Sequence, residues 1–140
     1  MSDNSDRNES KRAVVALLEQ NEKVLVIQRS EFVVAPGKIC FPGGHLEPGE
    51  TVEMALVREM QEELGLDVEP VKQVWHSHST WGIELFWWQA NHLADQEIRW
   101  DPQEVAWARW MSWQEFRQSD DLLSSNMEFL DAMAAGQILL

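Results

Sequence analysis

The segment Gly44–Leu66, GHLEPGETVEMALVREMQEELGL, decides the fold of this chain. Its second half predicts a helix over residues 52–64, because an apolar residue recurs every four positions, at Val52, Leu56, Met60 and Leu64. Gly65 follows as a C-terminal cap. The segment is entered through Pro42-Gly43-Gly44, a stretch that cannot be helical and whose glycines can take positive φ.

Three glutamates of the predicted helix, Glu59, Glu62 and Glu63, are spaced i, i+3 and i+4. This spacing places them on an arc of roughly 100° of the helix surface. Carboxylates so close repel one another unless cations lie among them, and hard divalent ions such as Mg²⁺ or Mn²⁺ suit oxygen ligands. A lone E-x-x-E-E is more often an acidic solvated face. The fixed offsets of Glu50 and Arg58 favour a metal site here.

Together these residues form the pattern G-x5-E-x7-R-E-U-x-E-E-x-G-U, in which U is aliphatic. In this pattern the chain resembles the Nudix hydrolases, and the resemblance covers essentially residues 13–140. It implies an α/β (α+β) fold in which a mixed β-sheet is sandwiched between α-helices. It also implies an enzyme that uses Mg²⁺ or Mn²⁺ to hydrolyse a diphosphate linkage in a nucleoside diphosphate attached to a group X.

The resemblance also implies the metal ligands. Glu62 and Glu63 match carboxylate ligands of the family, and Gly43 matches the residue whose backbone carbonyl joins them. Glu59 matches a carboxylate that either binds metal or orients and deprotonates the attacking water. Glu104 stands six residues before Trp110-Met111-Ser112, as a fourth ligand does in MutT-type members, although a glutamate in a polar loop is usually just solvated.

Arg58 and Glu50 match a structural ion pair that locks the glycine-rich loop onto the helix. The expected catalytic set is therefore Glu50, Arg58, Glu59 and Glu63.

Three residues outside the helix are expected to bind substrate, again by resemblance to the MutT type. Arg29 lies twelve residues before Phe41, and Asn126 lies five residues after Asp121 in the loop DDLLSSN. An asparagine amide suits a purine edge because it both donates and accepts hydrogen bonds. The alternative for Asn126 is an ordinary helix N-cap.

The MutT resemblance favours a nucleoside triphosphate substrate, including an oxidised purine, which is cleaved to monophosphate and pyrophosphate. Hydrolysis of another nucleoside diphosphate derivative, such as a nucleotide sugar, is one alternative. A nucleotide-sensing module that binds without cutting is the other, although such modules often lose signature carboxylates and none is lost here.

The composition and net charge limit the classes of partner that this chain is expected to bind. A chain of 140 residues that is 44% hydrophobic suits a single domain. Its net charge of −13 should repel nucleic acid and anionic membranes, so the expected partner is a small-molecule nucleotide. One cysteine, an N-terminus without an apolar run and no stretch of transmembrane length indicate a cytoplasmic protein. Monomer and homodimer both stay open.

Apolar periodicity predicts the remaining elements. Residues 1–12 read as a disordered polar tail before a domain at 13–140. Strands are expected at 13–18 and 24–27, and these two are expected to pair as a hairpin. Further strands are expected within 74–90 and at 106–111, with a polar loop at 91–103 between them. A helical turn at 113–116 and a helix at 128–135 follow. Within 74–90, Trp81, Ile83, Leu85 and Trp87 are expected on one side of one strand.

Two weaker signals remain. His76 and His78, two residues apart, can face the same way from a strand and either bind a metal or form a polar strand face. Cys40 has no partner base that the sequence can name, which favours a packed small residue over a nucleophile.

Overall fold

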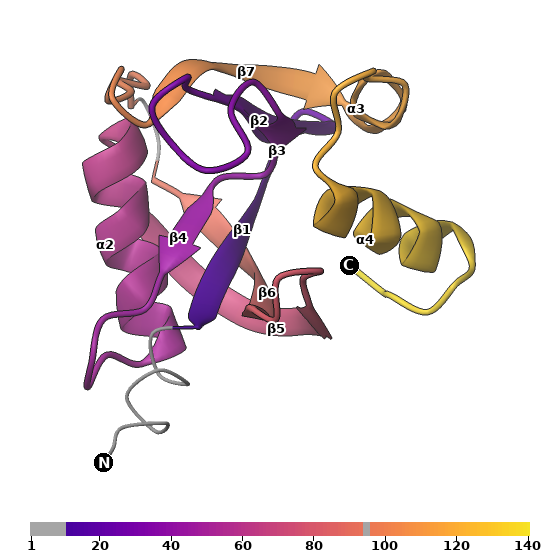
Figure 1. The fold of residues 1–140 in the computed structure, drawn as a ribbon, viewed down its shortest axis with the longest axis horizontal. Coiled ribbons are helices and arrows are strands. Elements are labelled where there is room, and N and C mark those ends of the chain that lie inside the picture. Colours follow the sequence, from indigo (N-terminus) through magenta and orange to yellow (C-terminus); the bar gives the residue numbers. More distant parts are fainter. Residues whose placement is uncertain (1–10, 94–95) are drawn as a thin grey trace.

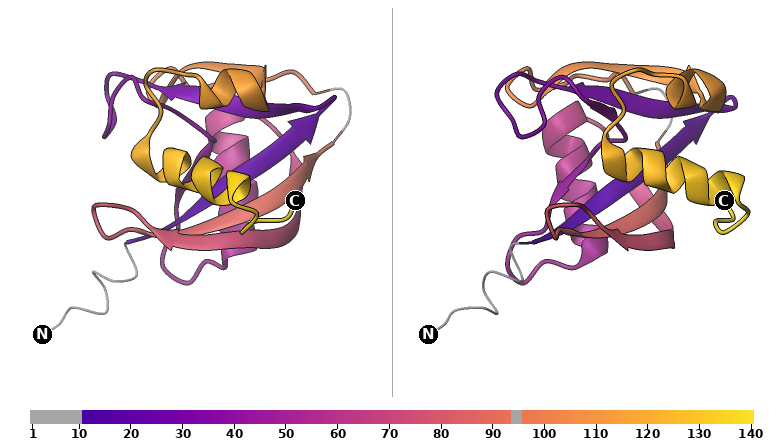
Figure 2. Two further views of the ribbon diagram at one scale, coloured as in Figure 1. Left: turned by 90° about the vertical axis from the view of Figure 1, so that its right-hand side faces the viewer. Right: turned by 45° about the vertical axis from the view of Figure 1, so that its right-hand side comes forward.

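The computed structural model describes residues 11–93 and 96–140. Its elements are β1 Arg12–Gln20, β2 Lys23–Arg29, β3 Ile39–Cys40, β4 Gly43–His45, α2 Val52–Leu64, β5 Val68–His78, β6 Glu84–His92, β7 Val105–Ser112, α3 Trp113–Arg117 and α4 Ser124–Ala134. The strands follow the order β3-β2-β1-β6-β5, with β4 paired to β1 and β7 to β2. Helix α2 lies on one side of the strands and α4 on the other (Figures 1 and 2). The predicted α+β sandwich is confirmed.

Strand β1 forms the centre of the molecule and is buried on both faces, which explains its unbroken apolar sequence. It runs parallel to β6 and antiparallel to β2 and β4. Alternate side chains enter two separate hydrophobic clusters. The cluster that includes α2 takes Val14, Ala16 and Leu18, whereas the cluster that includes α4 takes Ala13, Val15 and Leu17.

The hairpin predicted between the first two strands is confirmed. Glu19 pairs with Val24 and Gln20 with Lys23. The connecting Asn21 and Glu22 both have positive φ, at 52° and 65°, which is the backbone twist that a two-residue hairpin turn requires.

Helix α2 has the predicted bounds. The Thr51 hydroxyl accepts a hydrogen bond from the Met54 N–H at 3.1 Å and caps the N-terminus. Gly65 adopts a left-handed conformation at φ 65° and ends the helix, with its N–H directed at the carbonyls of Gln61 and Met60. The buried apolar face of α2 consists of Ala55, Leu56, Met60 and Leu64.

The single strand predicted within 74–90 is wrong, because the segment contains a turn. β5 ends at His78 and β6 begins at Glu84, so Trp81 and Ile83 lie in the connection between two antiparallel strands. The Ser79 hydroxyl accepts hydrogen bonds from the N–H groups of Trp81 and Ile83, at 3.2 and 3.1 Å. Apolar periodicity did not predict this serine turn, because the turn itself contains apolar side chains.

The C-terminal elements follow the prediction with shifted bounds. β7 and α3 are present, and α3 begins with a capping box between Ser112 and Glu115. α4 begins at Ser124, not at residue 128, and Leu123 is its N-cap, so the N-cap alternative for Asn126 is wrong. The loop predicted from residue 91 starts later, because β6 continues to His92.

Of the predicted tail at 1–12, residues 1–10 lie outside the described range, and β1 already begins at Arg12. None of the helices within the described ranges is long and apolar enough to span a bilayer.

Candidate active site

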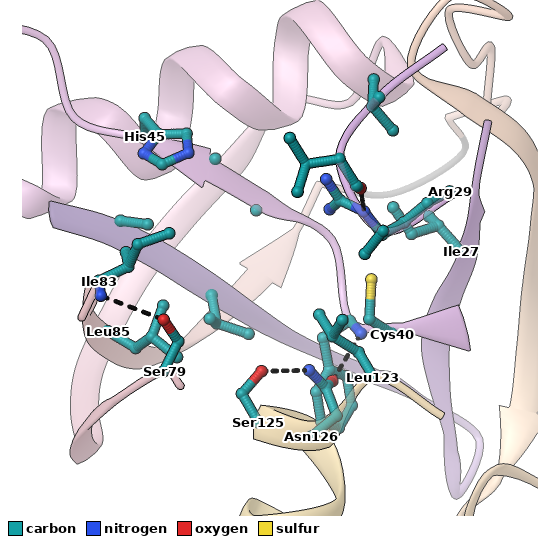
Figure 3. A pocket seen from close by; sticks show the side chains of 18 of the residues that line it. Ile27, Arg29, Cys40, His45, Ser79, Ile83, Leu85, Leu123, Ser125 and Asn126 are labelled. Atoms are coloured by element: carbon teal, nitrogen blue, oxygen red, sulfur yellow. Dashed lines mark hydrogen bonds between the residues drawn. The ribbon is translucent and has the colours of Figure 1, made fainter. Parts of the chain in front are cut away.

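A pocket of about 540 Å³ opens beside α2 and collects side chains from most of the sheet (Figure 3). Its lining comes from β1, β2, the 30–38 loop, β4, α2, the β5–β6 turn and the start of α4. Of the residues predicted from the sequence, it includes Arg29, Phe41, Gly43, Glu59, Glu63, Glu104 and Asn126. Glu50, Arg58 and Glu62 are described but do not line it.

The glycines at the pocket wall are required by close approach and not by φ. Gly43 and Gly44 lie in β4, and neither uses the positive φ that the sequence would allow. A Cβ on Gly43 would collide with the backbone carbonyl of Val14, and a Cβ on Gly44 would collide with the Glu59 carboxylate. Glycine at both positions therefore lets β4 pack between β1 and the acidic face of α2.

Two glutamates of α2 enter the pocket with strongly perturbed acidity. Glu63 is only 7% exposed and accepts a hydrogen bond from the Gly43 N–H at 3.4 Å. Burial raises the pKa of Glu63 to about 8, and the charges of Glu59 and Glu104 act in the same direction. Burial likewise raises the pKa of Glu59 to about 7, against the opposing effect of Arg58. These carboxylates keep protons near neutral pH unless another cation replaces them.

The donor chemistry of this cluster suits a divalent metal ion. Glu104 comes from the loop before β7 and lies close enough to raise the pKa of both Glu59 and Glu63. The three carboxylates thus line one pocket beside the backbone of β4. Oxygen ligands of this kind are what Mg²⁺ and Mn²⁺ prefer.

Arg58 ties the neighbouring loop to the helix. Its Nε and Nη2 donate to the two carboxylate oxygens of Glu50 at 2.7 and 2.9 Å, and Nη2 also donates to the His45 carbonyl at 3.0 Å. Its Nη1 donates to Glu59 and Glu62, both at 3.0 Å. The hydrogen bond from Arg58 lowers the pKa of Glu50. The structure therefore brings Glu50 and Arg58 together in a bidentate pair.

Glu62 occupies a different position from the other two helix glutamates. Its side chain is 56% exposed, against 13% for Glu59, and its carboxylate faces Arg58 at the outer side of the helix.

Arg29 and Cys40 form the opposite wall of the pocket. The Nε of Arg29 donates to the Val34 carbonyl at 2.6 Å and so holds the 30–38 loop against β2. Cys40 is buried, and this burial raises the pKa of its thiol to about 12. A protonated, buried thiol is a poor nucleophile, which agrees with the packed residue that the sequence favoured.

Asn126 connects α4 to the pocket. Its Oδ1 accepts the backbone N–H of Phe41 at 2.9 Å, and its Nδ2 donates to the Ser125 hydroxyl at 3.3 Å (Figure 3). The Phe41 ring is buried, with its centroid 4.7 Å from that of Phe116 and 5.7 Å from that of Phe129. Both predicted substrate residues thus also serve the packing of α4.

Sequence reasoning missed two aromatic residues at the rim. Phe32 in the 30–38 loop and Trp81 in the β5–β6 turn both line the pocket, yet their side chains are 64% and 59% exposed. The sequence carried no distinct signal for them, because each loop also holds other apolar residues, and only the fold brings the two loops to one pocket.

The family model described as the NUDIX domain matches residues 9–133. The chain belongs to this family.

Curated proteins are similar in sequence to this chain over shorter stretches. The NAD-capped RNA hydrolase NudC of Stutzerimonas stutzeri (strain A1501) is 30% identical over 98 residues, which cover 70% of this chain and 35% of that protein. The 8-oxo-dGTP diphosphatase of Escherichia coli (strain K12) is 41% identical over 54 residues, covering 39% of this chain and 42% of that protein. The chain thus spans less than half the length of these relatives.

Solved structures extend the likeness to the whole fold. A MutT protein from Methanosarcina mazei Go1 superposes with a TM-score of 0.72 at 21% identity, covering 89% of this chain and 93% of that one. At this identity the likeness concerns the fold alone.

Proposed function

We propose that this protein is a Mg²⁺-dependent pyrophosphohydrolase that cleaves a nucleoside diphosphate-X linkage. Its principal substrate is a nucleoside triphosphate, oxidised purines included, and the products are the monophosphate and pyrophosphate. The observation that carries the proposal is the meeting of Glu59, Glu63 and Glu104 in one pocket beside a glycine strand. The names of relatives, among them an 8-oxo-dGTP diphosphatase and a CTP pyrophosphohydrolase, support the same chemistry.

The residues that would hold Mg²⁺ or Mn²⁺ are Glu59, Glu62, Glu63 and Glu104, together with the backbone carbonyl of Gly43. When bound, the cation supplies charge neutralisation at phosphate oxygens and acidifies bound water. Glu62 would reach such a cation only by giving up its hydrogen bond with Arg58.

Other residues act on the substrate and the water. As the alternative to its role as a metal ligand, Glu59 takes the proton of the attacking water at its carboxylate. Arg58 positions that carboxylate through its Nη1 contact. Arg29, a cation in the pocket wall, binds phosphate oxygens and compensates an otherwise acidic site.

The pocket dimensions and rim fit a nucleotide. A volume of about 540 Å³ lies within the ordinary range for small-molecule sites. Phe32 and Trp81 offer aromatic surface on which a base can stack, and Asn126 offers an amide at the pocket floor. The net charge of −13 supports a free nucleotide as the substrate over a nucleic acid.

The test compares Glu63→Gln with Glu128→Gln, an exposed glutamate on α4. Each protein is incubated with a nucleotide mixture and Mg²⁺, then with a chelator, and pyrophosphate release is measured. We expect Glu63→Gln to lose turnover by orders of magnitude with an unchanged circular dichroism spectrum, while Glu128→Gln keeps it. Near-normal turnover of Glu63→Gln refutes its ligand role. Nucleotide binding without metal-dependent release would instead identify a sensing module, and preferential cleavage of nucleotide sugars would reassign the substrate.

A further inference from the structure

A second cluster of possible metal ligands lies outside the active-site pocket, at the open end of the β5–β6 hairpin. His76 and His78 are two residues apart on β5, so their side chains share one face of the sheet. Glu84 is the cross-strand partner of His78 on β6. One ligand atom from each of the three side chains lies within 4.8 Å of the other two. The closest pair is His76 Nε2 and Glu84 Oε2, at 2.7 Å.

These three side chains have the chemistry of a borderline metal site and not of a magnesium site. Two imidazoles and one carboxylate with an open position are a common ligand set for zinc, while nitrogen ligands are disfavoured by Mg²⁺. Ligands about 2.0–2.2 Å from a tetrahedral zinc are roughly 3.3 Å apart, so only small side-chain rotations are needed. Both histidines are exposed, which leaves room for a water as fourth ligand.

Neighbouring residues hold the cluster in place. The Nε of Arg12 lies 3.8 Å from Glu84 Oε1, on the oxygen that does not face His76. The Phe86 ring supports the His76 ring at a centroid distance of 4.9 Å, and the Arg12 guanidinium lies 5.2 Å from the same Phe86 ring. Glu84 can therefore present Oε2 to a metal while its other oxygen faces Arg12 as an ion-pair partner.

We propose that His76, His78 and Glu84 form a second metal site, which takes a borderline divalent cation such as Zn²⁺. The site would clasp the two strands at the base of the turn that carries Ser79, Trp81 and Ile83 to the pocket. It differs from the carboxylate site in its donors, its metal preference and its place in the sheet.

The test titrates Zn²⁺ into the metal-free protein in the presence of millimolar Mg²⁺, which competes for the carboxylate site only. Calorimetry counts the bound ions, and imidazole resonances in NMR spectra identify the ligands. The test variants are His78→Asn and the double variant His76→Asn/His78→Asn. His92→Asn is the matched control, because His92 lies in the same sheet at the far end of β6 and contacts the Leu93 carbonyl and the Trp110 ring, not the three proposed ligands.

We expect the wild-type protein and His92→Asn to bind one more Zn²⁺ ion than the double variant. The single variant should lose more than the 10- to 100-fold in affinity that removal of an outer hydrogen-bond partner typically costs. Zinc should shift the imidazole resonances of His76 and His78 and leave those of His92 in place. Equal zinc stoichiometry and affinity in all proteins, or unshifted His76 and His78 resonances in the wild type, would refute the metal site and leave only a His76–Glu84 hydrogen bond. The wild-type spectra decide the matter even if a variant fails to fold.

Discussion

Replacing Arg58 by lysine tests whether the shape of the guanidinium, and not its charge alone, holds the loop between β4 and α2. Arg58 is 22% exposed and Glu50 9% exposed, and two short hydrogen bonds join them. Hydrogen bonds to charged groups contribute about 1.5–3 kcal/mol each, and a lysine ammonium can reproduce only one of the two. We therefore expect Arg58→Lys to lower the free energy of unfolding by about 2–3 kcal/mol.

The assay is urea denaturation of the metal-free protein, with Arg117→Lys as a matched control. Arg117 contacts Asp131 at 2.7 Å through one nitrogen, and the two side chains are 45% and 61% exposed. A pair this exposed contributes about 1 kcal/mol or less, so Arg117→Lys should change stability little. If both variants lose the same small amount, the bidentate Arg58–Glu50 pair does not stabilise the loop, and the reasoning fails.

Three further outcomes are expected. Gly44→Ala should displace the Glu59 carboxylate with which the new Cβ collides, so Mg²⁺ affinity and turnover should both fall; calorimetry showing unchanged affinity would contradict this. The raised pKa values of Glu59 and Glu63, about 7 and 8 against an ordinary 4.5, mean that the metal-free folded protein keeps protons that the unfolded chain has lost. Its melting temperature should therefore fall as pH rises from about 5 to 8, and Mg²⁺ should raise the melting temperature more at pH 8 than at pH 6. Thermal melts in which the effect of Mg²⁺ does not depend on pH would contradict the raised pKa values. Asn126→Ala leaves the buried N–H of Phe41 without its acceptor and should cost about 1–3 kcal/mol in urea denaturation, whereas an unchanged midpoint would show that another group replaces the amide.

Elements with a strong local signal were predictable from the sequence. Helix α2 combines an apolar period of four, a threonine cap and a terminal glycine, and each of these acts within a few residues. The β1–β2 hairpin was predictable for the same reason. The turn between β5 and β6 was not predictable. The Ser79 hydroxyl stabilises it through local hydrogen bonds, but Trp81 and Ile83 in the same turn have the periodicity of strand residues.

The candidate site was likewise predictable only in part. Spacing along one helix placed Glu59 and Glu63 together, and resemblance to a family added Glu104. Whether Glu62 turns toward the pocket or toward Arg58 depends on a choice among hydrogen-bond partners that spacing does not determine. The hydrogen bond between Asn126 and the Phe41 N–H joins residues 85 positions apart, which no local pattern records.

The pairing of β1 links the hydrophobic interior to the chemistry. Val14 pairs with Gly44 and Val15 with Gly43, so the register of β1 also sets the height of the glycine strand beside α2. A shift by one residue would exchange the side chains of the two clusters and move both glycines away from the carboxylates. During evolution, β1 can therefore accept apolar exchanges of similar volume but no insertion or deletion.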